Sequence, residues 1–278
     1  MSKKLIYLFF LSITMLIKAS LIFHGTEDTL KTLKTIMENK KSGCYLRFGD
    51  GDINLAYGLG ELCQPFNAQN IQKEMREAFA LNGPTIIKTL PLYCKEFNGL
   101  EPYMFPGNHE VSYTQACGMV EKVRFLWGGS MQDIYSPCAL AYAATHLPSL
   151  AVDFLKFLRS QNCLALVANE NIPAHIRELL FGHDCVFIPT PAQDVFSQIN
   201  RIELDCKKLL SQHNEYRVIV LSMGCSGRIL AKRLWQTFDN IFIFDFGSLM
   251  DALCGWNSRA WIELTQFNKD QFLAEFSK

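Results

Sequence analysis

The chain has 278 residues, of which 49% are hydrophobic and 19% are charged, and its formal net charge at pH 7 is zero. This composition supports a packed core, in one large domain or in one domain with a sizeable insertion, and excludes extensive disorder. Zero net charge argues against non-specific binding to nucleic acid, because such binding depends on a strongly basic surface.

The first 23 residues have the pattern of a signal peptide or a membrane anchor. Two lysines precede an apolar run over residues 5–17, and a lysine and two small residues follow it. Because the run is short for a bilayer span, a cleaved signal and an uncleaved anchor both stay open, and either predicts an exported or membrane-associated protein. An anchor would have a cytoplasmic N-terminus and the rest of the chain on the far side. The alternative is an N-terminal helix packed on a cytoplasmic domain.

Hydrophobic periodicity predicts the following elements in chain order. The first half has a helix over 27–40, strands over 44–46 and 85–90, a helix over 70–81, and an irregular insertion over about 93–136 with one helix near 113–125. The second half has helices over 150–159, 172–181, 192–211 and 226–236, and strands over 163–168, 185–188, 217–221 and 241–244. Pro189 and Pro191 are expected to stop the strand over 185–188.

The regular second half indicates the fold class. Residues 163–168 form a continuous apolar run, as in a strand buried on both faces. Alternating strands and helices predict an α/β fold with a mostly parallel sheet, helices on both faces and an irregular insertion. Right-handed crossovers then place every strand-to-helix loop at one edge of the sheet.

Ten cysteines are present, and no two of them form a Cys-x-x-Cys pair. We expect buried thiols that behave as small hydrophobic side chains. A disulfide framework is a weaker alternative because a chain of this length needs no cross-links, and a zinc site lacks the usual ligand spacing.

The most informative segment is Arg47-Phe48-Gly49-Asp50-Gly51-Asp52. It follows a predicted strand, and the carboxyl ends of strands are where α/β folds bind ligands. Its glycines let the backbone approach a phosphate closely. If the segment is extended, Asp50 and Asp52 point to the same side and can hold one Mg²⁺ or Mn²⁺ ion, which in turn binds a diphosphate. The alternative is an ordinary turn, which this sequence also favours.

Two later loops are expected at the same edge of the sheet. The glycine-containing turn Ser222–Gly227 joins a strand to a helix, so its N–H groups suit an anion, with Ser226 as a cap or phosphate ligand and Arg228 as a phosphate partner. The alternative is a tight turn required by the fold, followed by a surface charge. Asp245-Phe246-Gly247 closes the last strand, and Asp245 is a candidate contact for a ribose, for waters of a cation or for the acceptor hydroxyl. The alternative role for Asp245 is a helix cap.

These motifs resemble those of the GT-D type glycosyltransferases, whose signature is Arg-Phe-Gly-Asp-Gly-Glu. The order of elements over about 26–256 is also similar: a helix precedes the signature, Pro189-Thr190-Pro191 precedes a long helix, and the closing Asp245-Phe246-Gly247 stands in place of Asp-Ile-Gly. The resemblance implies a Rossmann-like fold over residues 24–278. It also implies transfer of a sugar from a nucleotide-sugar donor, typically a UDP-sugar, to a hydroxyl acceptor on a glycan or glycoprotein.

The same resemblance assigns roles to residues of this chain. Asp50 and Asp52 would hold Mn²⁺ or Mg²⁺ against the diphosphate, and Asp52, then Asp245, would be the candidate catalytic base. The donor-binding residues would be Arg47, Gly49, Gly51, Gly224, Ser226, Arg228 and Gly247. Asp52 stands where the family has Glu, which retracts the carboxylate by about 1.5 Å and weakens its case as the base.

Two other functions fit parts of the pattern. In a Rossmann-like methyltransferase, the turn Ser222–Gly227 would hold S-adenosylmethionine and no metal would be needed. In a non-catalytic exported binding module, the acidic pair would be a degenerate motif. The replacement of Glu by Asp52 and the signal-like N-terminus motivate the second alternative.

Overall fold

The computed structural model describes residues 21–61, 69–92, 112–128, 131, 133–161 and 163–278. Its strands are β1 (Ile22–His24), β2 (Gly43–Leu46), β3 (Ile86–Lys88), β4 (Asp133–Tyr135), β5 (Ala165–Asn169), β6 (Val186–Thr190), β7 (Arg217–Ser222) and β8 (Ile241–Asp245). The helices of the first half are α2 (Thr26–Glu38), α3 (Asp50–Ala56), α4 (Gln69–Ala80), α5 (Tyr113–Arg124), α6 (Ala139–His146) and α7 (Pro148–Ser160). Those of the second half are α8 (Ala174–Phe181), the 3₁₀ helix η2 (Val195–Gln198), α9 (Ile199–Leu210), α10 (Ser226–Trp235), α11 (Leu249–Leu253), α12 (Ala260–Leu264) and α13 (Lys269–Phe276).

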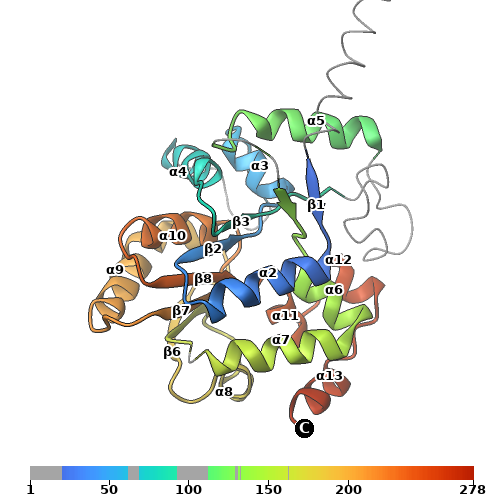
Figure 1. Ribbon diagram of the computed structural model, residues 1–278, viewed down its shortest axis with the longest axis vertical. Coiled ribbons are helices and arrows are strands. Elements are labelled where there is room, and N and C mark those ends of the chain that lie inside the picture. The colour runs from blue at the N-terminus through green and yellow to red at the C-terminus, as the bar shows by residue number, and fades with distance from the viewer. Residues whose placement is uncertain (1–20, 62–68, 93–111, 129–130, 132, 162) are drawn as a thin grey trace, which may run out of the picture.

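A parallel sheet forms the centre of the molecule (Figure 1). In the described part of the chain it has six strands in the order β3-β2-β8-β7-β5-β6, and every neighbouring pair is parallel. A separate two-stranded parallel sheet pairs β1 with β4. The predicted α/β fold with a mostly parallel sheet is therefore confirmed. Since the six strands run in one direction, their carboxyl ends share one edge, where the following loops meet.

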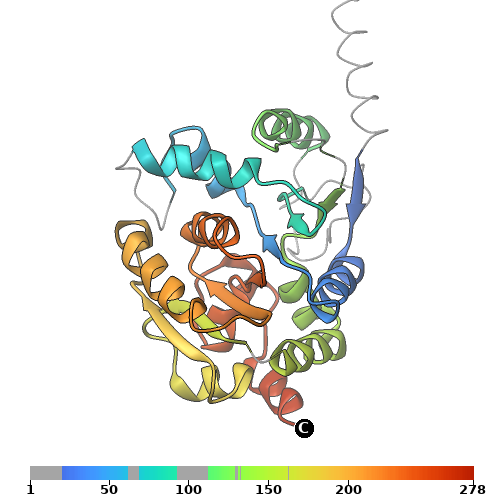
Figure 2. The same ribbon diagram turned by 60° about the vertical axis from the view of Figure 1, so that its left-hand side comes forward.

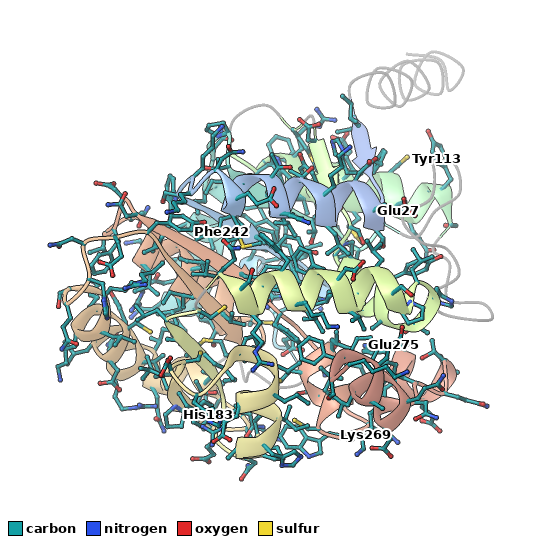
Figure 3. The ribbon with its side chains drawn as sticks, turned by 60° about the horizontal axis from the view of Figure 1, so that its bottom comes forward. Glu27, Tyr113, His183, Phe242, Lys269 and Glu275 are labelled. Atoms are coloured by element: carbon teal, nitrogen blue, oxygen red, sulfur yellow. The ribbon has the colours of Figure 1, made fainter. Side chains whose placement is uncertain are left out.

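Helices cover both faces of this sheet, which confirms the predicted layering (Figures 1 and 2). On strand β7, Ile219 and Leu221 belong to the apolar cluster that includes α4, α9 and α10, whereas Val218 and Val220 belong to the cluster that includes α2, α7 and α8. Successive side chains of a strand point to opposite faces, so a strand covered on both sides is apolar throughout. Phe242 of β8, marked in Figure 3, lies fully buried in the second cluster.

Strand β6 differs from its prediction at its end. Pro189 was expected to stop the strand, but β6 continues through it to Thr190, and Pro189 pairs in register with Ala168 of β5. The reason is position: β6 lies at the edge of the sheet, where a proline removes no hydrogen bond to a second neighbour. The following helix begins late, at Ile199, because Asp194 adopts a left-handed conformation with φ 49° before the short η2.

Several elements had no prediction from the sequence. These include the strands β1 and β4 and the helices α3, α6, α12 and α13, all of eight residues or fewer. Of the insertion expected over about 93–136, residues 93–111, 129–130 and 132 lie outside the described residues; the rest contains α5, as expected, and β4.

The N-terminal segment predicted over residues 1–23 falls largely outside the described residues, which begin at Leu21. Leu21 is buried, and residues 22–23 lie in β1, so the last three residues of that segment are part of the fold. Within the described ranges, no helix combines the length and apolarity that a membrane crossing requires. The described cysteines are free thiols, of which Cys44, Cys117, Cys163 and Cys206 are buried as expected.

Candidate active site

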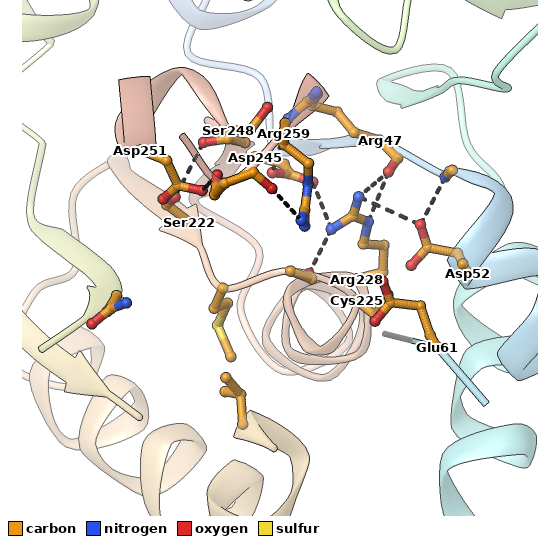
Figure 4. Close-up of a pocket in the computed structure, with 18 of the residues that line it drawn as sticks. Arg47, Asp52, Glu61, Ser222, Cys225, Arg228, Asp245, Ser248, Asp251 and Arg259 are labelled. Atoms are coloured by element: carbon orange, nitrogen blue, oxygen red, sulfur yellow. Dashed lines mark hydrogen bonds and ion pairs between the residues drawn. The ribbon is translucent and has the colours of Figure 1, made fainter. Parts of the chain in front are cut away.

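A cavity of about 350 Å³ opens at the carboxyl edge of the main sheet. Residues that end or follow β2, β5, β6, β7 and β8 line it, so it occupies the ligand-binding position of an open α/β sheet. Figure 4 shows the loops that follow β2, β7 and β8 converging on this cavity. Of the ten site residues expected from the sequence, nine line it: Arg47, Gly49, Asp50, Gly51, Asp52, Gly224, Arg228, Asp245 and Gly247.

The segment after β2 begins a helix instead of continuing as an extended chain. Gly49 is the N-cap of α3, and Asp52, at the third helical position, accepts a hydrogen bond from the Gly49 N–H at 2.7 Å. This hydrogen bond is the half of a capping box in which the acidic side chain at the third helical position accepts from the N-cap N–H. Residues two apart in a helix point about 200° apart, since each residue advances about 100°. The segment is therefore not extended, and the reason for expecting Asp50 and Asp52 on the same side does not hold.

The two aspartates accordingly have different surroundings. Asp50 is exposed, and its Oδ1 accepts a hydrogen bond from the Gly51 N–H at 2.9 Å. Asp52 is 2% exposed, and its Oδ1 is buried without a hydrogen-bond partner. Burial raises the pKa of Asp52, while the positive charge of Arg228 and the Gly49 hydrogen bond act in the opposite direction.

Two arginines and two aspartates from four segments meet in the cavity; we call Arg47, Asp52, Arg228 and Asp245 the charge cluster (Figure 4). Arg228 Nη2 lies 3.5 Å from Asp52 Oδ2, and Arg228 Nη1 lies 3.3 Å from Asp245 Oδ2. Arg47 Nη1 lies 3.8 Å from Asp245 Oδ1. The four charges cancel, so the cluster is neutral as a unit.

The guanidinium of Arg228 is fixed by backbone carbonyls as well as by carboxylates. Its Nε donates to the Arg47 carbonyl at 2.8 Å, Nη2 donates to the same oxygen, and Nη1 donates to the Gly224 carbonyl at 2.5 Å. Burial lowers the pKa of Arg228, but the nearby charges of Asp245 and Asp52 outweigh it and raise the pKa overall. Arg228 is therefore a permanent, rigidly held positive charge.

Gly247 makes room for the second arginine. A Cβ built on Gly247 would lie 1.2 Å from Arg47 Nη1, and the residue has φ 69°, a conformation that side chains disfavour. The Arg47 guanidinium thus crosses the backbone directly after β8, with its Nε donating to the Pro137 carbonyl. The closing Asp-Phe-Gly element supplies both the carboxylate and the space that position Arg47.

The turn after β7 contributes mainly backbone atoms to the cavity lining. Gly224 has φ 57° and lines the cavity with Met223 and Cys225. Ser226, expected as a cap or phosphate ligand, is 1% exposed and is not among the cavity-lining residues. Burial, and the neighbouring charge of Asp52, hold the pKa of the Cys225 thiol well above its usual range, so this cysteine stays a neutral thiol.

Further cavity residues were not among the site residues expected from the sequence. Asn169 and Thr190 end β5 and β6, and their positions at strand ends were the available signal. Asp251 accepts a hydrogen bond from the Ser258 hydroxyl, and burial raises the pKa of Asp251 although that hydrogen bond lowers it. Glu61 had no sequence signal, and it reaches the cavity because its side chain packs against Gly51.

The residues present do not fit a divalent ion shared between Asp50 and Asp52. Asp52 Oδ2 already accepts the Gly49 hydrogen bond and faces the guanidinium of Arg228, and Asp50 is exposed, with its Oδ1 bound to the Gly51 N–H. Among the described residues, no group of three or more His, Cys, Asp or Glu side chains is arranged to hold a metal ion. The buried oxygens Asp52 Oδ1 and Asp245 Oδ2 accept no hydrogen bond here.

The fold and the position of the cavity define an α/β protein of the class that binds ligands at the carboxyl edge of a parallel sheet. No protein-family model and no curated protein matches the chain. Several solved structures are similar to the chain in fold. One is a selenomethionine-substituted structure of domain of unknown function 1792, with a TM-score of 0.60 and 15% identity over 84% of this chain and 80% of that one.

Two similar structures carry a functional description. One, of the same domain, is described as having a distinct glycosyltransferase fold, with a TM-score of 0.59 and 14% identity over 84% of this chain and 80% of that one. The other is described as a new glycosyltransferase from Streptococcus sanguinis, with a TM-score of 0.56 and 17% identity over 83% of this chain and 82% of that one. At these identities the likeness establishes the fold, which is that of a glycosyltransferase-like α/β domain.

Proposed function

We propose that this chain is a glycosyltransferase that moves a sugar from a nucleotide-sugar donor, a UDP-sugar by preference, to a hydroxyl of a glycan or glycoprotein. The observation that carries the proposal is the charge cluster in a cavity at the carboxyl edge of the sheet. The likeness to structures described as glycosyltransferases supports the class. The motif over residues 47–52 supports the nucleotide-sugar donor.

In this proposal the diphosphate of the donor lies against the loops after β2, β7 and β8. Arg47 and Arg228 present guanidinium groups to the cavity, and Gly49, Gly51, Gly224 and Gly247 keep backbone within reach of the ligand. An arginine beside phosphate stabilises the negative charge that accumulates on the leaving group. Ser226 is buried and does not line the cavity, so its role in this proposal is to support the turn after β7.

The transfer step then breaks one bond and forms one. The acceptor oxygen attacks the anomeric carbon, and the bond from that carbon to the diphosphate oxygen breaks, leaving its electron pair on the diphosphate. The acceptor proton passes to a carboxylate. Asp52 is the first candidate, because its raised pKa favours proton uptake and its carboxylate lies in the cavity, and Asp245 is the second.

A divalent ion, Mn²⁺ or Mg²⁺, was expected from the sequence and would neutralise the leaving diphosphate. The pair Asp50 and Asp52 does not provide a shared site for it, as described above. No step of the proposed mechanism therefore depends on a metal ion.

Donor hydrolysis and donor binding test the proposed function directly. UDP-glucose turnover to UDP is measured with the purified chain, with and without Mn²⁺, alongside thermal denaturation in the presence of UDP-glucose or S-adenosylmethionine. We expect slow release of UDP and a higher melting temperature with UDP-glucose, since a ligand that binds the folded state stabilises it. Stabilisation by S-adenosylmethionine with no response to UDP-glucose would favour a methyltransferase, and no response to either ligand would favour a non-catalytic binding module.

A further inference from the structure

Arg228 lies between the two buried carboxylates of the charge cluster. It comes from the first turn of α10 and lies between Asp52 of α3 and Asp245 of β8 (Figure 4). A cation that bridged these two carboxylates would have to occupy the same position. The side chain is 11% exposed, so water screens this charge weakly.

The oxygens that a metal ion would need are engaged with arginine. Both oxygens of Asp245 face a guanidinium, Oδ1 that of Arg47 and Oδ2 that of Arg228. Asp52 Oδ2 faces Arg228 and accepts the Gly49 N–H. Mg²⁺ requires close, nearly octahedral oxygen ligands. An ion at the remaining Asp52 Oδ1 would be repelled by a guanidinium held on the same carboxylate.

Arg228 is also held so that it cannot move aside easily. Three of its hydrogen bonds end on the backbone carbonyls of Arg47 and Gly224, which belong to the loops after β2 and β7. Its charge is therefore preorganised before the donor binds, which is the condition for efficient electrostatic catalysis.

We infer that the guanidinium of Arg228, assisted by Arg47, takes the place of the divalent cation, so that the enzyme uses its nucleotide-sugar donor without a metal ion. This inference rests on the proposed glycosyltransferase function. When the bond between the anomeric carbon and the diphosphate breaks, the electron pair goes to the diphosphate oxygen and its charge faces the two arginines. The acceptor proton goes to a carboxylate of the cluster.

The test compares UDP-glucose turnover in EDTA and in Mn²⁺ for the wild-type chain, Arg228→Ala and Arg228→Lys. We expect wild-type turnover to agree within about twofold between the two conditions, and Arg228→Ala to lose about 100-fold in EDTA. Removing the guanidinium frees Asp52 and Asp245, so Mn²⁺ should restore part of the turnover of Arg228→Ala. Arg228→Lys should retain an intermediate rate in EDTA, because it keeps the charge but not the forked geometry.

Manganese binding, read by electron paramagnetic resonance, gives a second readout that needs no turnover. The wild-type chain should leave Mn²⁺ free, and Arg228→Ala should bind it, with circular dichroism confirming that both are folded. If Arg228→Ala does not fold, two other measurements decide the question: the turnover of Arg228→Lys in EDTA and the binding of Mn²⁺ by the wild-type chain.

The outcomes separate the inference from the function on which it rests. Wild-type turnover that is lost in EDTA and restored by Mn²⁺ would overturn the inference and leave the glycosyltransferase proposal standing. Absence of turnover under every condition would overturn the proposed function. In that case the manganese measurement still tests the inference. If the wild-type chain binds Mn²⁺ and Asp52→Asn does not, the inference that Arg228 takes the place of the cation is rejected.

Discussion

Helix α10 carries two ion-pair clusters, and they differ in how completely their charges are satisfied. Arg228 of α10 belongs to the charge cluster. Lys232 lies four residues later on the same face of the helix and belongs to a second cluster, which joins α10 to α4. In that second cluster Lys232 Nζ lies 2.5 Å from Glu74 and 2.6 Å from Glu77. Arg233 extends it, 2.5 Å from Glu74 and 2.6 Å from Glu203 of α9. We call Glu74, Glu77, Glu203, Lys232 and Arg233 the interhelix cluster.

The contacts of the charge cluster are looser. Its ion pairs span 3.3 to 3.8 Å, and Asp52 Oδ1 and Asp245 Oδ2 accept no hydrogen bond. Ion pairing and hydrogen bonding lower the pKa of Glu74 and of Glu203 against the effect of burial, whereas burial prevails at Asp52 and raises its pKa. Buried polar atoms without partners are costly, so a fold retains them where a ligand will use them. We therefore expect the charge cluster to bind ligand and the interhelix cluster to stabilise the fold.

Lys232→Met gives the largest effect expected from this comparison. The side chain is 4% exposed, and its loss leaves Glu74 and Glu77 without their central partner. Breaking a buried ion pair from one side costs about 3 kcal/mol. Urea denaturation should show that loss in the free energy of unfolding, while the rate of the folded enzyme with UDP-glucose stays within about twofold, since Lys232 does not line the cavity.

A loss of turnover in Lys232→Met that exceeds its loss of folded protein would contradict the division between the two clusters. The matched control is Lys73→Met. Lys73 also pairs with Glu77, at 3.9 Å, but it is 78% exposed, so its removal should change the stability by less than about 1 kcal/mol.

Gly247→Ala tests the geometry of the charge cluster. The new Cβ meets Arg47 Nη1, so Arg47 must leave its place beside Asp245, and the backbone must keep φ 69° at a cost of about 1 kcal/mol. We expect kcat/KM for the donor to fall about 10-fold, equivalent to 1.4 kcal/mol of transition-state stabilisation.

Gly182→Ala is the control for backbone strain alone. Gly182 also has a positive φ, 86°, but a Cβ there meets nothing within 4 Å. Gly182→Ala should lose stability through backbone strain, because φ 86° with ψ 167° is a conformation that only glycine adopts readily, and it should keep normal kinetics. Equal kinetics in both variants would show that the placement of Arg47 by Gly247 has no part in catalysis.

The sequence predicted the parts of the structure that depend on regular patterns. The apolar strands over 163–168 and 217–221 predicted buried parallel strands, and their loops predicted which edge would carry the site. Asp245 was found because it ends a strand, and Arg228 because it begins the helix after a strand-to-helix turn; both positions are visible in a sequence.

The parts that failed depend on contacts between distant segments. The start of α3 at Asp50 turned the predicted pair of ligands into one exposed and one buried carboxylate, because Gly-Asp-Gly-Asp suits a helix start as well as a turn. The pairing of Arg228 with both Asp52 and Asp245 joins residues far apart in the chain, so no local pattern announces it. Pro189 was misjudged because whether a strand lies at an edge is a property of the sheet.

The smallest expected effect is the pH dependence of stability, which should have opposite signs in the two clusters. For Asp52 the folded pKa is raised, so the folded state binds more protons than the unfolded state between the ordinary Asp pKa and the raised one, and stability falls as pH rises through that window. For Glu203 the folded pKa is lowered, so its contribution is present above the ordinary Glu pKa and is lost as pH falls through the lowered one.

Urea denaturation of the wild-type chain, Asp52→Asn and Glu203→Gln across the acidic range measures both signs, because subtracting the wild-type curve removes the groups that the three proteins share. Asp52→Asn should gain stability relative to wild type as pH rises, and Glu203→Gln should lose it, by about 1.4 kcal/mol for each unit of pKa shift removed. If Asp52→Asn instead follows Glu203→Gln, the Asp52 carboxylate is a satisfied structural ion pair like those of the interhelix cluster, and its role as the proton acceptor is rejected.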